Sequence, residues 1–273
     1  MRTTLAALFW AALAVPALAG TLELSQPVEQ GALVRGLTDP GAKVALDGKP
    51  LRVAPDGHFI FGLGRDAPNR AALDVVFPDG TRAHRDLAVA AQHYDIERIA
   101  GLPEKQVTPD PDTLARIKHD AAAIRAAHQT DSSALFFEAP LRWPVTGRIS
   151  GVYGSQRILN GEPRAPHLGT DIAAPVGTPI GAAAGGTVTI AEPDFILDGG
   201  TVVIDHGYGL STLYIHLSSI AVHAGDAVAQ GQTIGTVGAT GRATGPHLHW
   251  GVNWYALALD PMMAAGPMPE TAK

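Results

Sequence analysis

Residues 244–252 read TGPHLHWGV, and this short stretch decides how the second half of the chain is interpreted. In a β-strand alternate side chains share a face, so His247 and His249 point to one side while Leu248 points to the other. The Gly-Pro before the pair ends a loop, and the Trp-Gly-Val after it continues an apolar strand. Two imidazoles on one pleated face make a candidate metal or proton-transfer site, although a His-x-His pair alone is a weak signal.

A second motif, His167-Leu168-Gly169-Thr170-Asp171, lies well upstream of the first. Pro166 and Gly169 argue against a helix, so we expect a loop that enters a strand and can still bring both polar side chains to one ion. Imidazole nitrogen and carboxylate oxygen are suitable zinc ligands. Taken alone, the motif is equally consistent with a turn-capping aspartate beside a histidine that faces solvent.

A third histidine, His216, follows the alternating run from Ser211 to Ile215. Two histidines and one aspartate suffice for a catalytic zinc site whose fourth position stays open for water. Two further histidines then remain to accept and return the proton of that water. The sequence has no HExxH motif, and spacing alone leaves open which histidine of the 247/249 pair binds the metal.

The order His167-x-x-x-Asp171, His216 and His247-x-His249 resembles the lysostaphin and LytM-type endopeptidases, the M23 peptidases of peptidoglycan, over about residues 141–261. The resemblance implies that His167, Asp171 and His249 hold one Zn²⁺ per chain. It implies that His247 and His216 are the catalytic histidines and that the substrate is the peptide stem or cross-bridge of peptidoglycan. It also implies an antiparallel β-sheet that forms a groove.

Three polar residues precede His167 in a glycine-containing loop: Arg157, Asn160 and Arg164. One of them is a candidate for binding the substrate or the oxyanion that develops on the attacked carbonyl. A solvated loop is the alternative interpretation. Other polar pairs, such as Asp205-His206, are interpreted as turns outside the metal site, and His128 as a solvated helical residue.

The rest of the chain predicts a mainly β protein. Short strand-like runs separated by Asp-Gly turns at 47–48, 56–57 and 79–80 predict a β-sandwich-like domain over residues 20–91. Residues 92–140 read as a linker in which Asp110-Pro111 starts one amphipathic helix. Its expected apolar face consists of Leu114, Ile117, Ala121, Ile124 and Ala127. The peptidase domain is expected over residues 141–262, followed by a loose tail over 263–273.

Composition narrows the function further. The chain has 273 residues, no cysteine and a formal net charge of −6, which excludes a cysteine nucleophile, a Cys₄ zinc site and a lipid-modified cysteine, and argues against nucleic acid as the partner. Arg2 followed by the apolar run from Leu5 to Val15 and Ala17-Leu18-Ala19 predicts a cleaved signal peptide over residues 1–19. We therefore expect an exported, periplasmic protein with no stable membrane anchor after cleavage. A regulatory protein partner is left open.

Three other functions compete with this interpretation. Glycine-rich turns such as Gly231-Gln232-Thr233 also occur in biotinyl and lipoyl carrier domains, which need an exposed lysine; the lysines here are Lys43, Lys49, Lys105, Lys118 and Lys273, all outside the relevant region. A serine hydrolase would need a Gly-x-Ser-x-Gly elbow, which the sequence lacks. A catalytically inactive LytM-type activator of a cell-wall amidase would have lost metal-site residues, and all five positions are filled here. In the setting of a periplasm, the expected bond is D-alanyl to meso-diaminopimelate.

Overall fold

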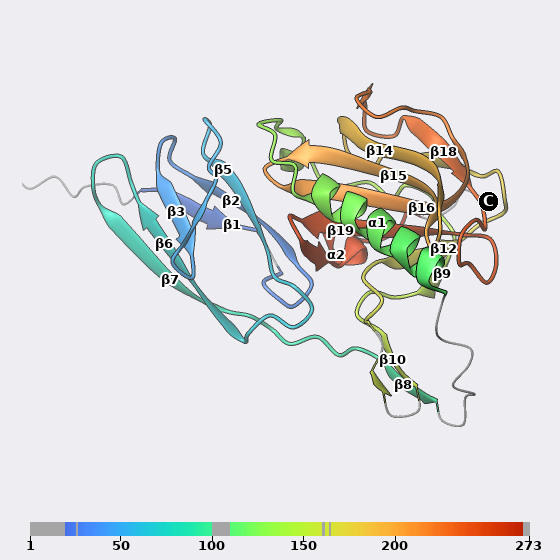
Figure 1. Ribbon diagram of the computed structural model, residues 1–273. Coiled ribbons are helices and arrows are strands. Elements are labelled where there is room, and N and C mark those ends of the chain that lie inside the picture. Colours follow the sequence, from blue (N-terminus) through green and yellow to red (C-terminus); the bar gives the residue numbers. More distant parts are fainter. Residues whose placement is uncertain (1–19, 26, 100–109, 160–161, 164, 270–273) are drawn as a thin grey trace, which may run out of the picture.

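The computed structural model describes residues 20–25, 27–99, 110–159, 162–163 and 165–269. It contains two β lobes, a smaller one from the N-terminal part of the chain and a larger one from the C-terminal part (Figure 1). The expectation of a mainly β protein with antiparallel sheets is confirmed. The expected signal peptide lies outside the described residues. In the described part of the chain, no helix has the length and apolar character needed to cross a bilayer.

The smaller lobe is built from two sheets. One has the order β1-β2-β5, formed by β1 (Leu22–Leu24), β2 (Leu33–Thr38) and β5 (His58–Gly62). The other has the order β4-β3-β6-β7, formed by β3 (Lys43–Leu46), β4 (Lys49–Leu51), β6 (Arg70–Val76) and β7 (Arg82–Ala88). Alternate residues of the two sheets form a shared core that includes Val34, Phe59, Phe61, Leu73 and Val75. The strand periodicity read from the sequence thus fits a sandwich.

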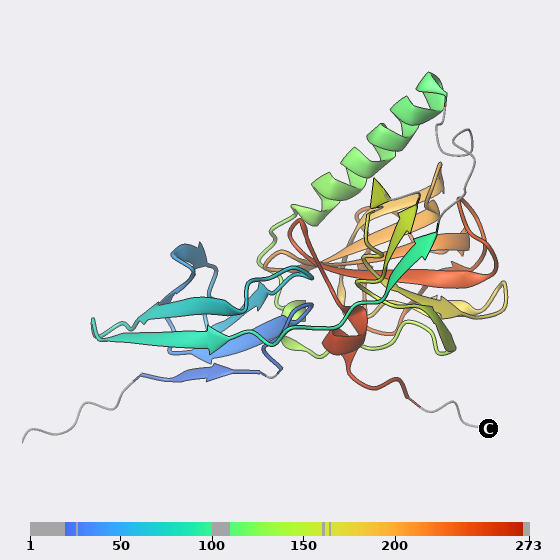
Figure 2. The same ribbon diagram turned by 90° about the horizontal axis from the view of Figure 1, so that it is seen from below.

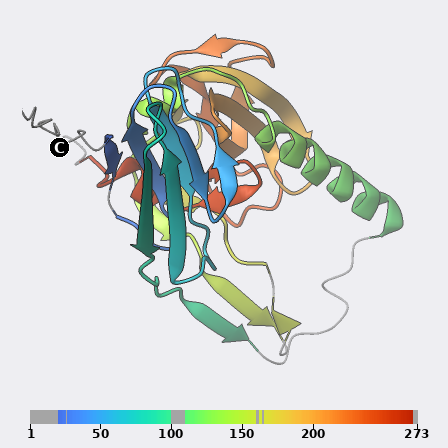
Figure 3. The same cartoon turned by 90° about the vertical axis from the view of Figure 1, so that its left-hand side faces the viewer.

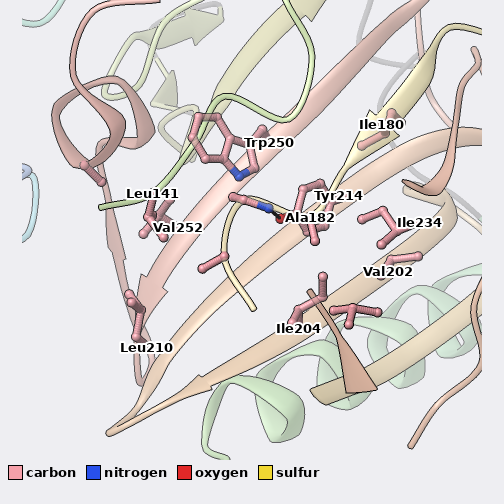
Figure 4. Packing of buried hydrophobic residues seen from close by; sticks show 14 of the residues in the cluster. Leu141, Ile180, Ala182, Val202, Ile204, Leu210, Tyr214, Ile234, Trp250 and Val252 are labelled. Carbon is pink, nitrogen blue, oxygen red and sulfur yellow. Dashed lines mark hydrogen bonds between the residues drawn. The ribbon is translucent and has the colours of Figure 1, made fainter. Parts of the chain in front are cut away.

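The larger lobe is a ten-stranded sheet. Its main path runs β17 (Ala227–Val228), β14 (Gly186–Phe195), β15 (Gly199–Gly207), β16 (Leu210–Ile220), β19 (His247–Trp254), β12 (Thr170–Ala173) and β9 (Arg148–Gly151). Three more strands join it, namely β13 (Pro179–Gly181), β18 (Thr233–Val237) and β20 (Leu257–Leu259). Figure 4 shows how Tyr214 from β16 and Trp250 from β19 lie in the same apolar core, together with Ile204 from β15.

Helix α1 (Pro111–His128) lies against β14 and β15 of the larger lobe. Viewed from the sandwich side, it runs along the flank of that lobe rather than between the two lobes (Figure 3). Asp110 caps its N-terminus by accepting from the backbone N–H groups of Asp112 and Thr113, as its position before Pro111 predicts. The expected apolar face is wrong at Leu114, which is 37% exposed.

Short elements complete the structure. They are β8 (Ile96–Ile99), η2 (Phe136–Glu138), β10 (Gln156–Leu159), β11 (Glu162–Pro163) and α2 (Pro261–Ala265). Strands β8 and β10 pair in parallel, so the segment after the sandwich is joined to the loop before His167. Helix α2 lies at the junction of the lobes (Figure 2), with Met263 against the sandwich core. The expectation of a loose tail from residue 263 is therefore wrong for its described first part, where Trp143 Nε1 donates to Gly266 O.

Candidate metal centre

Strand β19 presents two histidines to one carboxylate. His249 Nδ1 lies 2.8 Å and His247 Nε2 lies 3.9 Å from Asp171 Oδ1. The side chains of His247 and His249 are 14% and 15% exposed, while Leu248 between them is fully buried. In the β12–β19 register Asp171 lies directly opposite His249. The three polar groups therefore meet because of strand alternation and strand register.

The third ligand candidate, His167, lies in the loop before β12. Its backbone N–H donates to Ser155 O and its carbonyl accepts from the Gly154 N–H, each over 2.8 Å. Its ring Nδ1 lies 3.0 Å from Val152 O, so this nitrogen carries the proton. The lone pair on Nε2 is then directed toward Asp171 Oδ1, 3.1 Å away.

Three electron-pair donors converge at this point. Besides the two contacts to Asp171 Oδ1, His167 Nε2 lies 3.0 Å from His249 Nδ1. Two imidazole nitrogens at this distance require a proton or a cation between them. Ligands of tetrahedral zinc with bonds of ~2.0–2.1 Å lie about 3.3 Å apart, close to the separations found here. The donor set of His167, Asp171 and His249 thus fits Zn²⁺ with a fourth position open.

The protonation state of Asp171 agrees with a ligand role. Burial by itself would raise the pKa of Asp171, but hydrogen bonds and positive charge from His167 and His249 outweigh it and hold the pKa far below its usual range. The ionised carboxylate, which is the form that binds a metal, is therefore favoured.

His216 lies beside His247, with ring centroids 4.7 Å apart. Its Nδ1 is 2.8 Å from Thr240 O, and His247 Nδ1 is 2.8 Å from Gly245 O. Carbonyl oxygens accept hydrogen bonds, so both Nδ1 atoms carry the proton and both Nε2 atoms are free to accept one.

The environment of His216 keeps its ring neutral. Burial, with a smaller contribution from the neighbouring imidazoles, lowers the pKa of His216 to about 4. The residue is only 7% exposed. At neutral pH it can therefore act as a base rather than as a fixed positive charge.

Thr240 is a residue of this site that the sequence did not single out. Its carbonyl accepts from His216, while its Oγ1 accepts from the Gly200 N–H (3.0 Å) and donates to Leu217 O (2.8 Å). It thereby fixes the orientation of the His216 ring. Thr240 stands before Gly241 in a loop that carries none of the expected site residues, so only its contact with His216 of β16 reveals its role.

The other residues singled out in the sequence do not lie among the described residues of the metal centre. Arg157 lies in β10, whereas Asn160 and Arg164 lie outside the described residues, so a substrate or oxyanion role for these three stays a prediction. The pair Asp205-His206 is not a turn, because both residues lie within β15. His206 is fully buried and apart from the metal centre, and its ring nitrogens contact Gly185 O (2.7 Å) and Thr212 Oγ1 (2.8 Å).

Comparison with known proteins identifies relatives of the chain. The sequence profile of Peptidase family M23 matches residues 165–261. Peptidoglycan DD-endopeptidase ShyA of Vibrio cholerae is 42% identical over 239 residues, which cover 82% of this chain and 54% of that protein. DD-carboxypeptidase/endopeptidase Mpg of Neisseria meningitidis is 43% identical over 104 residues, 38% of this chain and 24% of that protein. The chain thus spans about half, or less, of the length of these curated relatives.

A solved structure gives the more complete match. A protein from Pseudomonas aeruginosa, described as a peptidase M23, superposes with a TM-score of 0.64 at 30% sequence identity. The superposition covers 88% of this chain and 97% of that one. Since this relative is matched over nearly its whole length, and the family profile spans His167, Asp171, His216, His247 and His249, the chain belongs to peptidase family M23.

Proposed function

We propose that this chain is a zinc-dependent endopeptidase that hydrolyses the peptide cross-links of bacterial peptidoglycan. The observation that carries the proposal is the convergence of His167 Nε2, Asp171 Oδ1 and His249 Nδ1 within 3.1 Å of one another. These three residues would hold the metal, one ion per chain. The inactive-activator alternative is not favoured, because every ligand and both further histidines are present.

The metal and the histidines have separate tasks. When bound here, Zn²⁺ would polarise the scissile carbonyl and lower the pKa of a water molecule from 15.7 to roughly 7. His216 Nε2 accepts the proton of the attacking water, because its ring is neutral and its Nδ1 is held by Thr240 O. The same proton then passes to the leaving amine by way of the adjacent His247, which stabilises the tetrahedral intermediate while it carries that proton. Such proton transfers contribute ~10²–10⁴ to a rate.

The bond and the location are inferred from the relatives and the N-terminal sequence. The Vibrio and Neisseria relatives are named DD-endopeptidase and DD-carboxypeptidase/endopeptidase, which supports D-alanyl–meso-diaminopimelate cross-links as the target. The apolar segment over residues 1–19 supports export to a Gram-negative periplasm. We assign the peptidase unit to residues 141–262 and the sandwich to residues 20–91, with residues 92–140 linking them.

Digestion of purified peptidoglycan tests the proposal. Residues 20–273 incubated with wall that contains meso-diaminopimelate should convert cross-linked dimers into monomers, with the cleaved bond identified by mass spectrometry. His249→Ala should lose the zinc ion of this centre together with digestion, and His216→Ala should keep that ion while losing ~10²-fold or more of turnover. His223→Ala is the matched control, since the His223 side chain is 92% exposed in the same lobe.

Three results would each contradict one part of the proposal. If the unchanged chain contains zinc but leaves the cross-links intact, the assigned reaction is wrong. If His216→Ala keeps near-normal turnover, His216 is not the base that accepts the proton of water. Release of glycyl peptides from wall with glycine bridges, with no effect on diaminopimelate cross-links, would overturn the bond assignment alone.

A further inference from the structure

A second group of metal-binding side chains lies far from the first in sequence. Asp56 and His58 flank the turn that leads into β5 of the sandwich, and Glu138 ends η2 just before the larger lobe begins. Each offers one ligand atom, and these atoms all lie within 4.8 Å of one another. The group joins two segments of the chain at the seam between the lobes.

The turn itself orients the first two side chains. The Gly57 N–H donates to Ala54 O (2.9 Å) and the Ala54 N–H donates to His58 O (2.7 Å), which closes a tight loop. Asp56 Oδ1 accepts from the His58 backbone N–H (3.1 Å), and Asp56 Oδ2 lies 3.0 Å from His58 Nδ1. Both groups are therefore placed by backbone contacts before any ligand is added.

Glu138 is held by its neighbours in the chain. Phe137 is only 1% exposed and belongs to the same apolar core as Ala54 and Ile60 of the sandwich. Arg35 Nε donates to Phe137 O (3.0 Å), and Arg35 donates through a second nitrogen to Ala139 O (3.2 Å). The backbone on either side of Glu138 is thus tied to β2, and its carboxylate is directed toward the Asp56 turn.

Two polar atoms of this group make no well-aligned hydrogen bond, although His58 Nδ1 lies 3.0 Å from Asp56 Oδ2. Glu138 Oε1 and His58 Nδ1 have almost no solvent-accessible surface, and neither makes a hydrogen bond of acceptable geometry within the described residues. No lysine or arginine in the described ranges forms an ion pair with Asp56 or Glu138. Buried polar atoms are normally satisfied, so two such atoms within one group of possible ligands call for an explanation.

The charges at this point favour a cation. A hydrogen bond from the His58 backbone lowers the pKa of Asp56, which keeps that carboxylate ionised. Burial, followed by the negative charge of Asp56, raises the pKa of Glu138. Two carboxylates side by side are mutually destabilising unless a proton or a metal ion lies between them.

We propose that Asp56, His58 and Glu138 form a second divalent-cation site that fastens the sandwich to the segment entering the larger lobe. One imidazole and two carboxylates suit Zn²⁺ rather than Mg²⁺ or Ca²⁺, which prefer oxygen ligands alone. The ligand atoms already lie within 4.8 Å of one another, and a tetrahedral zinc ion would require separations of about 3.3 Å. Its role is structural, because it bridges two segments and takes no part in the reaction proposed above.

Zinc stoichiometry of the full mature chain tests this site independently of the catalytic one. Unchanged protein should bind two zinc ions, His249→Ala one, Glu138→Gln one, and the double variant none, measured by elemental analysis after dialysis. Glu138→Gln preserves shape, and His58→Gln gives the same test from the opposite side of the seam. The matched control is His84→Gln, because His84 also lies near two acidic groups, Asp74 (2.7 Å) and Asp86 (3.5 Å), but is open to solvent.

Thermal unfolding gives a second readout. In the His249→Ala background, zinc at a hundredfold excess over its Kd should raise the melting temperature by about 5 °C or more, and Glu138→Gln should abolish this rise. If His249→Ala contains no zinc, or if Glu138→Gln leaves the zinc content unchanged, the pair of carboxylates merely shares a proton and the proposal is overturned. Undiminished wall digestion by His249→Ala, with one zinc ion retained, would contradict the proposed function and leave this site standing.

Discussion

Gly151 is the residue whose missing side chain makes room for the carboxylate of the metal centre. It lies opposite Asp171 in the β9–β12 pair. A Cβ placed on it would lie 2.4 Å from Asp171 Oδ2 and 2.9 Å from Asp171 Cγ, and its third nearest atom is Asp171 Cβ at 3.2 Å. A methyl group at this position is therefore accommodated only by moving the carboxylate away from His167 and His249.

Substituting Gly151→Ala should weaken zinc binding by ~10–100-fold, the usual effect of disturbing the groups that orient a ligand. The measurement is competition with a chromophoric chelator at neutral pH. Gly245→Ala is the matched control, because Gly245 borders His247 and an added Cβ there meets nothing within 4 Å. Equal zinc affinity in the two variants would show that the position of Asp171 does not matter for the metal.

His216 illustrates what a single residue hides from sequence analysis. Its place in a strand could be predicted from the alternation of residues 211–215, but β16 does not end there and continues to Ile220. Its backbone φ of 67° could not, since only the surrounding hydrogen bonds force a non-glycine residue into that conformation. Strain of this kind costs on the order of 1–3 kcal/mol and persists only where neighbouring structure fixes it.

At the scale of elements, the loop that contains Thr240 holds the His216 backbone and ring in place. It connects the start of β15 with the end of β16, because Thr240 Oγ1 bonds to Gly200 N–H and Leu217 O while its carbonyl holds His216. The His216 N–H in turn donates to Asp198 O. The position of the ring therefore depends on how three chain segments meet rather than on β16 alone.

Thr240→Val keeps the shape of the side chain and removes both bonds of its hydroxyl. We expect kcat for peptide hydrolysis to fall roughly tenfold, with KM and zinc content nearly unchanged, because the His216 ring loses its alignment. Thr240→Ser should restore most of the rate, since it regains the hydroxyl. Thr236→Val is a suitable control, as its hydroxyl bonds to Ser218 and Ser219 on the surface of the same hairpin. A lower zinc content in Thr240→Val would place its effect at the metal rather than at the base.

Helix α1 shows which part of an element the sequence predicts. Its start at Asp110-Pro111 follows from local chemistry and is confirmed. Its buried face follows from tertiary contacts, and here it includes Asp120, whose Oδ2 accepts from the Ile196 N–H (2.9 Å), while Leu114 is left exposed. Hydrophobic spacing cannot reveal that a carboxylate is needed to satisfy a backbone donor just after the end of β14.

The same helix-start signal recurs near the C-terminus, where its consequence was missed. Asp260 precedes Pro261 and accepts from the Met262 N–H (2.8 Å), so α2 begins just as α1 does. The composition of the following residues, rich in Pro, Met and Ala, suggested a loose tail instead. The contacts that hold this segment, from Met263 to the sandwich core and from Trp143 to Gly266 O, depend on the folded arrangement of distant parts of the chain.

At the scale of the whole molecule, the two lobes share apolar residues. Leu33, Ala54 and Ile60 from the sandwich belong to the core of the larger lobe, and Trp254 lies against the cores of both. Each lobe could be predicted from its own strand pattern. The contact between the lobes could not be predicted. Apolar residues on the outer face of a sandwich strand follow the same sequence pattern whether that face meets solvent or a second lobe.

Two buried histidines make the stability of the larger lobe depend on pH. His128, which lies at the end of α1, contacts Ser211 Oγ (2.8 Å) and is buried, contrary to the solvated position expected from the sequence. Burial lowers the pKa of His128 to about 4, and burial does the same for His206. Between about pH 6.5 and pH 4 the unfolded chain binds protons that the folded chain does not.

The stability contributed by a neutral His128 is therefore complete above about pH 6.5 and is lost as the pH falls toward 4. Between pH 7.5 and pH 5 this residue should account for a loss of about 2 kcal/mol in the free energy of unfolding, which His128→Asn should remove. Urea unfolding in the presence of EDTA can be followed by tryptophan fluorescence, because Trp143, Trp250 and Trp254 all lie in the larger lobe. His223→Asn, at an exposed histidine, serves as the control and should follow the unchanged chain. If His128→Asn loses as much stability over this range as the unchanged chain does, then His128 is not the buried neutral group that the structure indicates.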